Sequence, residues 1–277
     1  LAGKLSVSPT LATLLVNRGY TTWEQCRHFF RATLDDLHDP FLFAGMDAAV
    51  KRIEQAAARQ ERIIVYGDYD VDGISATALM CNVFEALDIP CEHYLPNRLT
   101  SGYGLSMRAV EECAAGGGGL LITVDCATTA CAEIERAAAL GLDVIVTDHH
   151  EPKTDLPRAV AIINPKVPGS GYPDASLAGV GVAFKLCQAL AASRGLDRSF
   201  WRRWLDLVAL GTAADIVALR GENRILVKEG FSVLKETEHP GLRELMALQQ
   251  VDTTALSTSQ VVFRIAPCLN AAGRLGD

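Results

Sequence analysis

The chain has 277 residues, of which 49% are hydrophobic, so it can form one large domain or two modest ones with a real core. No run of about 18 apolar residues is present, which argues against a transmembrane helix and against membrane association. The formal net charge of −7 argues against extensive binding of duplex nucleic acid, but it is compatible with an acidic site that is filled by metal ions.

The eight cysteines are scattered, and none forms a Cys-x-x-Cys motif. Several lie in apolar runs, so we expect reduced core residues of a cytoplasmic protein, with neither a disulfide framework nor a zinc site. The chain begins at Leu1 rather than Met and stops without a helix-stop signal, so we also expect it to be a fragment of a longer protein.

In chain order, residues 1–45 predict an N-terminal helical accessory segment that caps the sheet, with short helices at 9–16 and 23–30. A regular pattern then begins, with strands and helices in alternation. The expected strands are 63–66, 91–95, 120–124, 143–147 and 161–163. The expected helices are 47–60, 75–87, 106–115 and 129–140. This alternation predicts βαβ units and an α/β fold with a doubly wound, mostly parallel sheet.

Beyond the last strand the pattern predicts a largely helical C-terminal section. The expected helices are 177–194, 199–210, 224–235, 240–248 and 257–265. We divide the chain into the accessory segment, a catalytic domain over 46–220, and a helical section over 221–277 that leads toward a further domain. Trp201 and Trp204 are three residues apart on a helix, so packing is expected rather than stacking on a nucleic-acid base.

The first buried strand is followed directly by Asp68, Asp70 and Asp72. Ligands bind at the carboxyl ends of strands in open α/β sheets, and alternation along an extended chain would send all three side chains to one side. Two carboxylates about 4 Å apart repel by roughly 4 kcal/mol at an effective dielectric of 20, so the stretch predicts a cation site. An EF-hand is disfavoured because Leu79 stands at the twelfth position. A solvated acidic turn remains the alternative for this stretch alone.

Two later strands are also followed directly by residues that can ligate a metal ion. One runs into Asp125, and the other into Asp148, His149 and His150. Oxygen and imidazole ligands without thiolate suit Mn²⁺ or Mg²⁺ better than a structural zinc. The carboxylates suffice for two divalent cations about 3.5–4 Å apart, an arrangement that activates water and stabilises both oxygens in phosphoester hydrolysis. No Ser/His/Asp or Cys/His nucleophile set competes with this interpretation.

These residues resemble a known family. Gly67–Gly73, Val124-Asp125 and Asp148–His150 are similar to the signature motifs of the DHH phosphoesterase superfamily. Further stretches resemble its RecJ-type single-strand-specific exonucleases, namely 96–105, 177–184, 210–217 and 269–275.

The resemblance implies roles for individual residues. The implied metal ligands are Asp70 for the first ion, Asp72 for the second, Asp125 between both, and His149 and Asp215 for the second. Catalytic roles fall to Asp125, His149 and His150, the last facing the scissile phosphate. The implied substrate contacts are Arg98, His150, Gly273 and Arg274. Asp68 would support the ligands from outside the metal shell.

The chain departs from the family pattern at two places. Tyr66 stands where many members carry a histidine ligand, which predicts a weak or water-rich first metal site. Cys126-Ala127 replaces the usual small polar residue and glycine after Asp125, so the family pattern does not predict the local backbone geometry there.

The function implied by the resemblance is a metal-dependent exonuclease that degrades single-stranded DNA in the 5′–3′ direction during repair and recombination. One alternative is a phosphodiesterase of the same superfamily that acts on oligoribonucleotides or cyclic dinucleotides. Another is a non-enzymatic scaffold with the same fold. We expect a monomer with single-stranded DNA as its partner, and single-strand-binding proteins or helicases are candidate protein partners.

Overall fold

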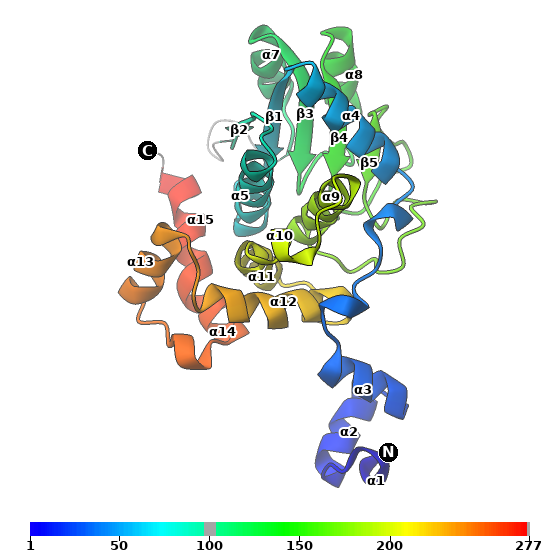
Figure 1. The fold of residues 1–277 in the computed structure, drawn as a ribbon, viewed down its shortest axis with the longest axis vertical. Helices are drawn as coiled ribbons and strands as arrows, with labels where there is room; N and C mark the ends of the chain where they lie inside the picture. Colours follow the sequence, from blue (N-terminus) through cyan, green and yellow to red (C-terminus); the bar gives the residue numbers. More distant parts are fainter. Residues whose placement is uncertain (97–103, 276–277) are drawn as a thin grey trace.

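A parallel sheet of five strands forms the centre of the computed structural model, which describes residues 1–96 and 104–275, the final four by backbone alone (Figure 1). The strand order is β2-β1-β3-β4-β5, and all four pairings are parallel. The strands are β1 (Arg62–Gly67), β2 (Glu92–Tyr94), β3 (Gly118–Val124), β4 (Asp143–Thr147) and β5 (Ala161–Ile163).

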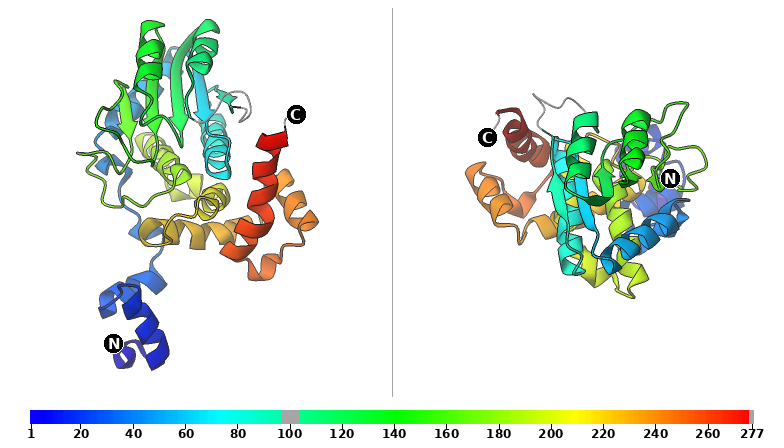
Figure 2. Two further views of the ribbon diagram at one scale, coloured as in Figure 1. Left: turned by 180° about the vertical axis from the view of Figure 1, so that it is seen from behind. Right: turned by 90° about the horizontal axis from the view of Figure 1, so that it is seen from above.

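Helices cover both faces of this sheet (Figures 1 and 2). One face carries α4 (Met46–Ala58), α5 (Val71–Ala86) and α9 (Gly179–Ser193), and the other carries α7 (Met107–Ala115) and α8 (Cys131–Ala139). Successive residues of β1 point to opposite faces, so Ile63 and Val65 join one apolar cluster while Ile64 and Tyr66 join the other. This arrangement confirms the predicted doubly wound α/β class.

The C-terminal section is helical, as predicted. Its elements are α10 (Arg198–Arg202), α11 (Leu205–Ala214), α12 (Gly221–Leu234), α13 (Pro240–Leu248), α14 (Thr258–Gln260), the π-helix η4 (Val261–Ile265) and α15 (Ala266–Leu275). The single helix predicted over 199–210 is wrong, because the chain breaks between α10 and α11. The break lets both indoles be buried, with Trp201 packed edge-on against Phe184 and Trp204 against Phe200.

The N-terminal helices are α1 (Ala2–Leu5), α2 (Pro9–Asn17) and α3 (Trp23–Arg31), followed by the 3₁₀ turns η1 (Leu34–Asp36) and η2 (Pro40–Leu42). The prediction that this segment caps the sheet is wrong, because α1–α3 lie beyond α12, away from the strands (Figures 1 and 2). The guanidinium of Arg224 in α12 lies 3.6 Å from the ring centroid of Phe29 and donates a hydrogen bond to its carbonyl. This cation–π contact and hydrogen bond hold α3 against α12.

Among the described residues, no helix has both the length and the apolar content required to cross a bilayer.

Candidate metal centre

The connection between β1 and α5 differs from the sequence-based expectation. Helix α5 begins at Val71, earlier than predicted, and Asp70 is its N-cap, accepting a hydrogen bond from the Gly73 N–H at 3.0 Å. The carboxylates therefore do not alternate along an extended chain. Asp70 stands at the start of the helix and Asp72 within its first turn, where the helix dipole favours negative charge.

Asp72 is directed at the N-terminus of α9. Its Oδ2 accepts a hydrogen bond from the Gly179 N–H at 2.7 Å, and its Oδ1 accepts one from the Val180 N–H at 2.8 Å. Amides at a helix start have no acceptor within the helix, so these two can donate to Asp72. They partly offset the charge of this carboxylate, whose residue is only 1% exposed. Each oxygen keeps a second lone-pair direction for a cation.

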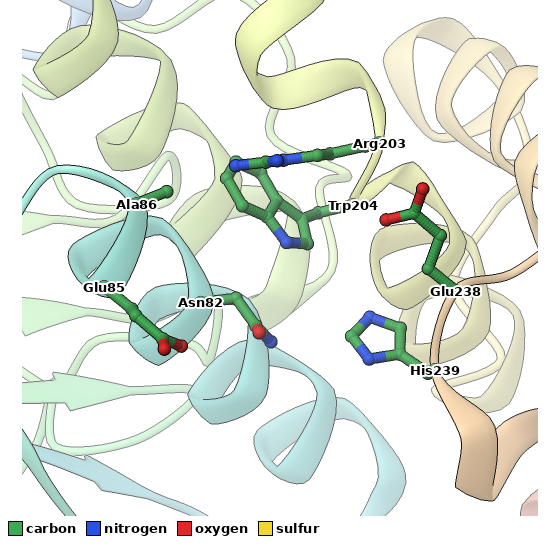
Figure 3. Close-up of a pocket in the computed structure, with 7 residues that line it drawn as sticks. All are labelled: Asn82, Glu85, Ala86, Arg203, Trp204, Glu238 and His239. Carbon is green, nitrogen blue, oxygen red and sulfur yellow. The ribbon is translucent and has the colours of Figure 1, made fainter.

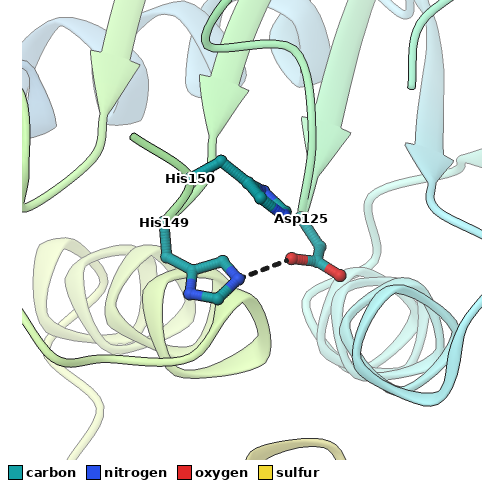
Figure 4. A group of neighbouring side chains, drawn as sticks. All are labelled: Asp125, His149 and His150. Carbon is teal, nitrogen blue, oxygen red and sulfur yellow. Dashed lines mark ion pairs between the residues drawn. The ribbon is translucent and has the colours of Figure 1, made fainter. Parts of the chain in front are cut away.

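Asp125 and His149 meet at the ends of β3 and β4. Figure 4 shows the His149 ring directed at the Asp125 carboxylate, and the His149 Nε2 lies 3.2 Å from Oδ1 of Asp125. The same nitrogen lies 3.6 Å from Oδ2 of Asp215 and 3.9 Å from Oδ2 of Asp72. Strands, α5 and the C-terminal end of α11 thus deliver these side chains to one place.

The donor atoms form overlapping groups, in each of which they lie within 4.8 Å of one another. The groups are Asp68, Asp70 and Asp125; Asp72, His149 and Asp215; and Asp125, His149 and His150. Asp125 links the first group to the His149 side of the centre. The five residues predicted as ligands are therefore brought together, and Asp68, predicted to stand outside the metal shell, lies among the donors as well.

Two buried atoms at this place fit a metal ion. Oδ1 of Asp125 and Nε2 of His149 have no hydrogen-bond partner within the part of the chain that the structure describes. Buried polar atoms are normally satisfied, so an unsatisfied oxygen and nitrogen facing each other are suited to ligate a cation. The donor set contains carboxylates and imidazole but no thiolate, which suits Mn²⁺ or Mg²⁺.

The electrostatics of the carboxylates also favour a cation. Burial raises the pKa values of Asp72 and Asp125 well above their ordinary range, and neighbouring carboxylates raise them further. Burial likewise raises the pKa of Asp215, and it raises that of Asp68 to about 6. A divalent ion would reverse this local field and hold the carboxylates ionised.

His150 is held by a buried network that the sequence interpretation missed. Its Nδ1 lies 2.7 Å from Oδ1 of Asp148, while Oδ2 of Asp148 accepts a hydrogen bond from the Thr128 N–H. The side-chain amide of Asn164 donates to the Thr128 hydroxyl and to the His150 carbonyl. Burial opposes ionisation of Asp148, but the His150 contact prevails and lowers its pKa to about 2. The bond to Asp148 raises the pKa of His150.

The remaining predicted residues are placed differently. Arg98 lies outside the described residues, and Gly273 and Arg274 lie in the last residues of α15, for which only the backbone is described. Helix α15 reaches the centre, because Oδ1 of its Asn270 accepts a hydrogen bond from the Val71 N–H at 3.1 Å. The Tyr66 hydroxyl donates to the Gly104 carbonyl at 2.8 Å and is therefore already engaged.

A separate hollow of about 400 Å³ lies between α5, the α10–α11 junction and the α12–α13 connection (Figure 3). The guanidinium of Arg203 covers the Trp204 ring at 4.1 Å from its centroid, and the indole is 6% exposed. Trp204 therefore packs, as predicted, and presents little free face to a base.

Comparison with known proteins agrees with this geometry. Residues 62–212 match the model of the DHH family, N-terminal domain. The chain is 43% identical over 275 residues to the single-stranded-DNA-specific exonuclease RecJ of Bacillus subtilis (strain 168), covering 99% of this chain and 34% of the relative. More generally, it spans about a third to a half of the length of the curated relatives it matches first.

Solved structures show the same fold. RecJ from Thermus thermophilus in complex with Mn²⁺ matches with a TM-score of 0.82 and 33% identity, over 99% of this chain and 38% of that one. The complex of the same protein with Mg²⁺ matches with a TM-score of 0.72 and 30% identity, over 99% and 35%. The family model covers more than half of the chain, including the ends of the three strands that carry the centre. The chain belongs to the DHH family.

Proposed function

We propose that this chain is the catalytic part of a divalent-metal-dependent phosphodiesterase that shortens single-stranded DNA. One observation carries the proposal: separate strands and helices place Asp72, Asp125 and His149 together, and Oδ1 of Asp125 and Nε2 of His149 are buried without a hydrogen-bond partner among the described residues. Such an arrangement opposes folding unless a cation is held there. Residues 46–220 would form the catalytic domain, with helical segments on either side.

The chain's own residues divide the work. The carboxylates of Asp70, Asp72, Asp125 and Asp215 and the imidazole of His149 would hold two ions, Mn²⁺ or Mg²⁺. When bound, such ions supply the Lewis-acid chemistry of phosphodiester hydrolysis. His150, fixed through its Nδ1 by Asp148, would present its other ring nitrogen to a phosphate oxygen and stabilise charge there.

The substrate class follows from the relatives. They are named single-stranded-DNA-specific exonucleases and match at 36–43% identity across most of this chain. We infer digestion in the 5′–3′ direction, with Arg98 and Arg274 contacting phosphates, in DNA repair and recombination.

The test uses the full-length protein with Mn²⁺ and end-labelled single-stranded DNA. Asp125→Asn should lower the rate by at least about a hundredfold, because a buried ligand that links the donor groups loses its charge. Asp206→Asn is the matched control, since Asp206 is equally buried but lies near the other end of α11, bonded to Thr237. Its activity should stay near that of the wild type.

Two outcomes would contradict the proposal. Wild-type rates from the Asp125→Asn protein would show that the centre does not take part in the hydrolysis. Faster hydrolysis of dinucleotides than of long single strands would assign the same centre to small substrates. Titration calorimetry with Mn²⁺ tests the scaffold alternative, which requires that no ion binds.

A further inference from the structure

The N-terminal helices differ in charge from the rest of the chain. Residues 1–32 contain a single acidic residue, Glu24, against the basic residues Lys4, Arg18, Arg27 and Arg31. The chain as a whole has a formal net charge of −7, so its negative excess lies entirely in the residues that follow. Single-stranded nucleic acid is a polyanion, and this segment is therefore better suited to contact it than the acidic body is.

One face of α3 combines an aromatic ring with two of these charges. Trp23, Arg27 and Arg31 follow one another at intervals of four residues, so their side chains share a face of the helix, and all three are exposed. They line a surface hollow of about 280 Å³, whose other residues are Glu24, His28, Ala32 and Asp36. The carboxylate of Asp36 accepts a hydrogen bond from the Thr33 N–H at 2.8 Å.

Trp23 differs from the other two tryptophans in its exposure. It is 36% exposed, whereas Trp201 and Trp204 are 8% and 6% exposed. The guanidinium of Arg27 lies 5.4 Å from the centroid of the Trp23 ring, so a positive charge stands directly beside the open indole. Exposed aromatic rings beside basic side chains are the features on which unpaired bases stack while their phosphates are neutralised.

The two guanidiniums have no protein anion to neutralise them. Among the side chains that the structure describes, neither Arg27 nor Arg31 forms a hydrogen bond or an ion pair. Other arginines of this chain are used differently, since Arg52 and Arg194 bind carboxylates. The charges of α3 are therefore available to an external anion.

The face is held in a fixed place. Arg224 and Lys228 of α12 donate hydrogen bonds to the carbonyls of Phe29 and Ala32, one at each side of the last turn of α3. The strands end toward α9 and α12, and α1–α3 project beyond α12 on the same side of the molecule (Figure 1). The face thus lies on the side of the sheet at which the metal centre is built, and its side chains are presented without further ordering of the helix.

We propose that the face formed by Trp23, Arg27 and Arg31 is a second contact for single-stranded DNA, apart from the metal centre. The indole stacks on a base, and the two guanidiniums contact phosphates on either side of it. The choice of DNA rests on the proposed function, but the contact itself needs no metal ion. An acidic protein would use the guanidiniums and leave the indole without a role.

The test measures binding without hydrolysis. The full-length protein is titrated in EDTA against a fluorescein-labelled oligothymidine, and fluorescence anisotropy gives the Kd at several salt concentrations. The Arg27→Gln/Arg31→Gln variant should bind about tenfold more weakly, and the slope of log affinity against log salt should fall by about 1.4, since each phosphate contact on a single strand contributes about 0.7. No divalent ion is present, so this result is independent of the hydrolysis test with Asp125→Asn.

Arg202→Gln/Arg243→Gln is the matched control. Both arginines are exposed, form no ion pair among the described residues, and lie on α10 and α13 rather than on α3. The control removes the same charge from the protein, and its Kd and salt slope should stay near those of the wild type. A control variant that loses as much affinity as Arg27→Gln/Arg31→Gln overturns the proposal, because net charge alone would then explain the effect.

Trp23 provides the second arm of the experiment. Trp23→Ala should weaken binding about five- to a hundredfold and leave the salt slope unchanged, because a stacked base releases no counterion. Trp23→Phe keeps an aromatic ring and should restore most of the affinity. The proposal is overturned if the arginine variant keeps the wild-type Kd and salt slope. It is equally overturned if Trp23→Ala binds DNA as the wild type does, since the face would then be a basic patch for an acidic partner.

Discussion

Asp125 combines a strained backbone with a buried carboxylate. Its φ of 62° is left-handed, a conformation that a non-glycine residue adopts at a cost, and its side chain is 2% exposed among other carboxylates. The absence of a side chain at Gly179 makes room for this carboxylate, because a Cβ there would lie 2.2 Å from Oδ1 of Asp125. The residue is therefore placed for ligation at the expense of stability.

This placement predicts opposite effects of Asp125→Asn with and without metal. In EDTA the variant should melt several degrees higher than the wild type, because a buried carboxylate among like charges becomes a neutral amide. Saturating Mn²⁺ should stabilise the wild type and leave the variant nearly unchanged. Thermal melts in both conditions measure this, and an equal Mn²⁺ shift in the two proteins would contradict it.

Ile216 follows Asp215 at the end of α11 and carries strain of its own. Its φ is 61° and its side chain is 83% exposed, so a β-branched residue occupies a position suited to glycine without a packing gain. Ile216→Gly should raise the free energy of unfolding of this chain by about 1 kcal/mol, measured by urea titration. Ile216→Val keeps the branching and should change little, and a destabilised Ile216→Gly protein would refute the strain argument.

At the scale of elements, the centre depends on how closely α5, α9, α11 and α12 approach one another. Helix α5 starts at Val71, with Asp70 as its N-cap, rather than at the predicted residue 75, and this places Asp72 against the first amides of α9. Gly230 of α12 allows the next contact, since a Cβ there would lie 2.2 Å from the Leu205 carbonyl and 2.5 Å from the Cβ of Ala209 in α11.

Gly230→Ala should therefore lower the free energy of unfolding by about 1–3 kcal/mol, because the added methyl forces α12 away from α11. Gly241→Ala is the matched control in α13, where nothing lies within 4 Å of the added Cβ. Alanine there should be neutral or stabilise by up to about 1 kcal/mol. Denaturant titrations of both variants measure these free energies of unfolding. Equal changes in the two variants would contradict the close approach of α12 to α11.

At the scale of the whole molecule, a buried ion pair and its hydrogen bonds join distant parts of the chain. The Nζ of Lys185 in α9 lies 2.6 Å from Oε1 of Glu222 in α12, and both side chains are at most 1% exposed. Lys185 also donates to the carbonyl of His38, whose N–H donates to Glu222, and the Tyr172 hydroxyl donates to Oε2 of Glu222. The segment after η1 is thus fastened to the domain through its backbone.

Lys185→Met should cost about 3–5 kcal/mol of unfolding free energy, because it leaves the Glu222 carboxylate buried without its cation. Lys228→Met is the control, since Lys228 likewise donates to an N-terminal carbonyl, that of Ala32, but its side chain is 47% exposed. Its cost should stay below about 1 kcal/mol. Proteolysis of the segment before residue 45 should accelerate only in Lys185→Met, and comparable proteolysis of both variants would argue against the fastening role.

The sequence by itself determined the α/β class and the five strands, and it singled out the carboxylate and imidazole residues that meet at the centre. These signals are local: apolar runs mark strands, and Asp125 and Asp148–His150 stand directly after them. Motif order added Asp215, which no local pattern links to the centre.

Only the tertiary structure decided which groups meet. It placed Asp68 among the donors and directed the Tyr66 hydroxyl to the Gly104 carbonyl. It also showed that amides of α9 donate hydrogen bonds to Asp72 and that the N-terminal helices lie away from the sheet. The physical reason is that these contacts depend on helix start points and on close packing between segments remote in sequence, such as Asp72 and Gly179, and neither leaves a periodic signal in the chain.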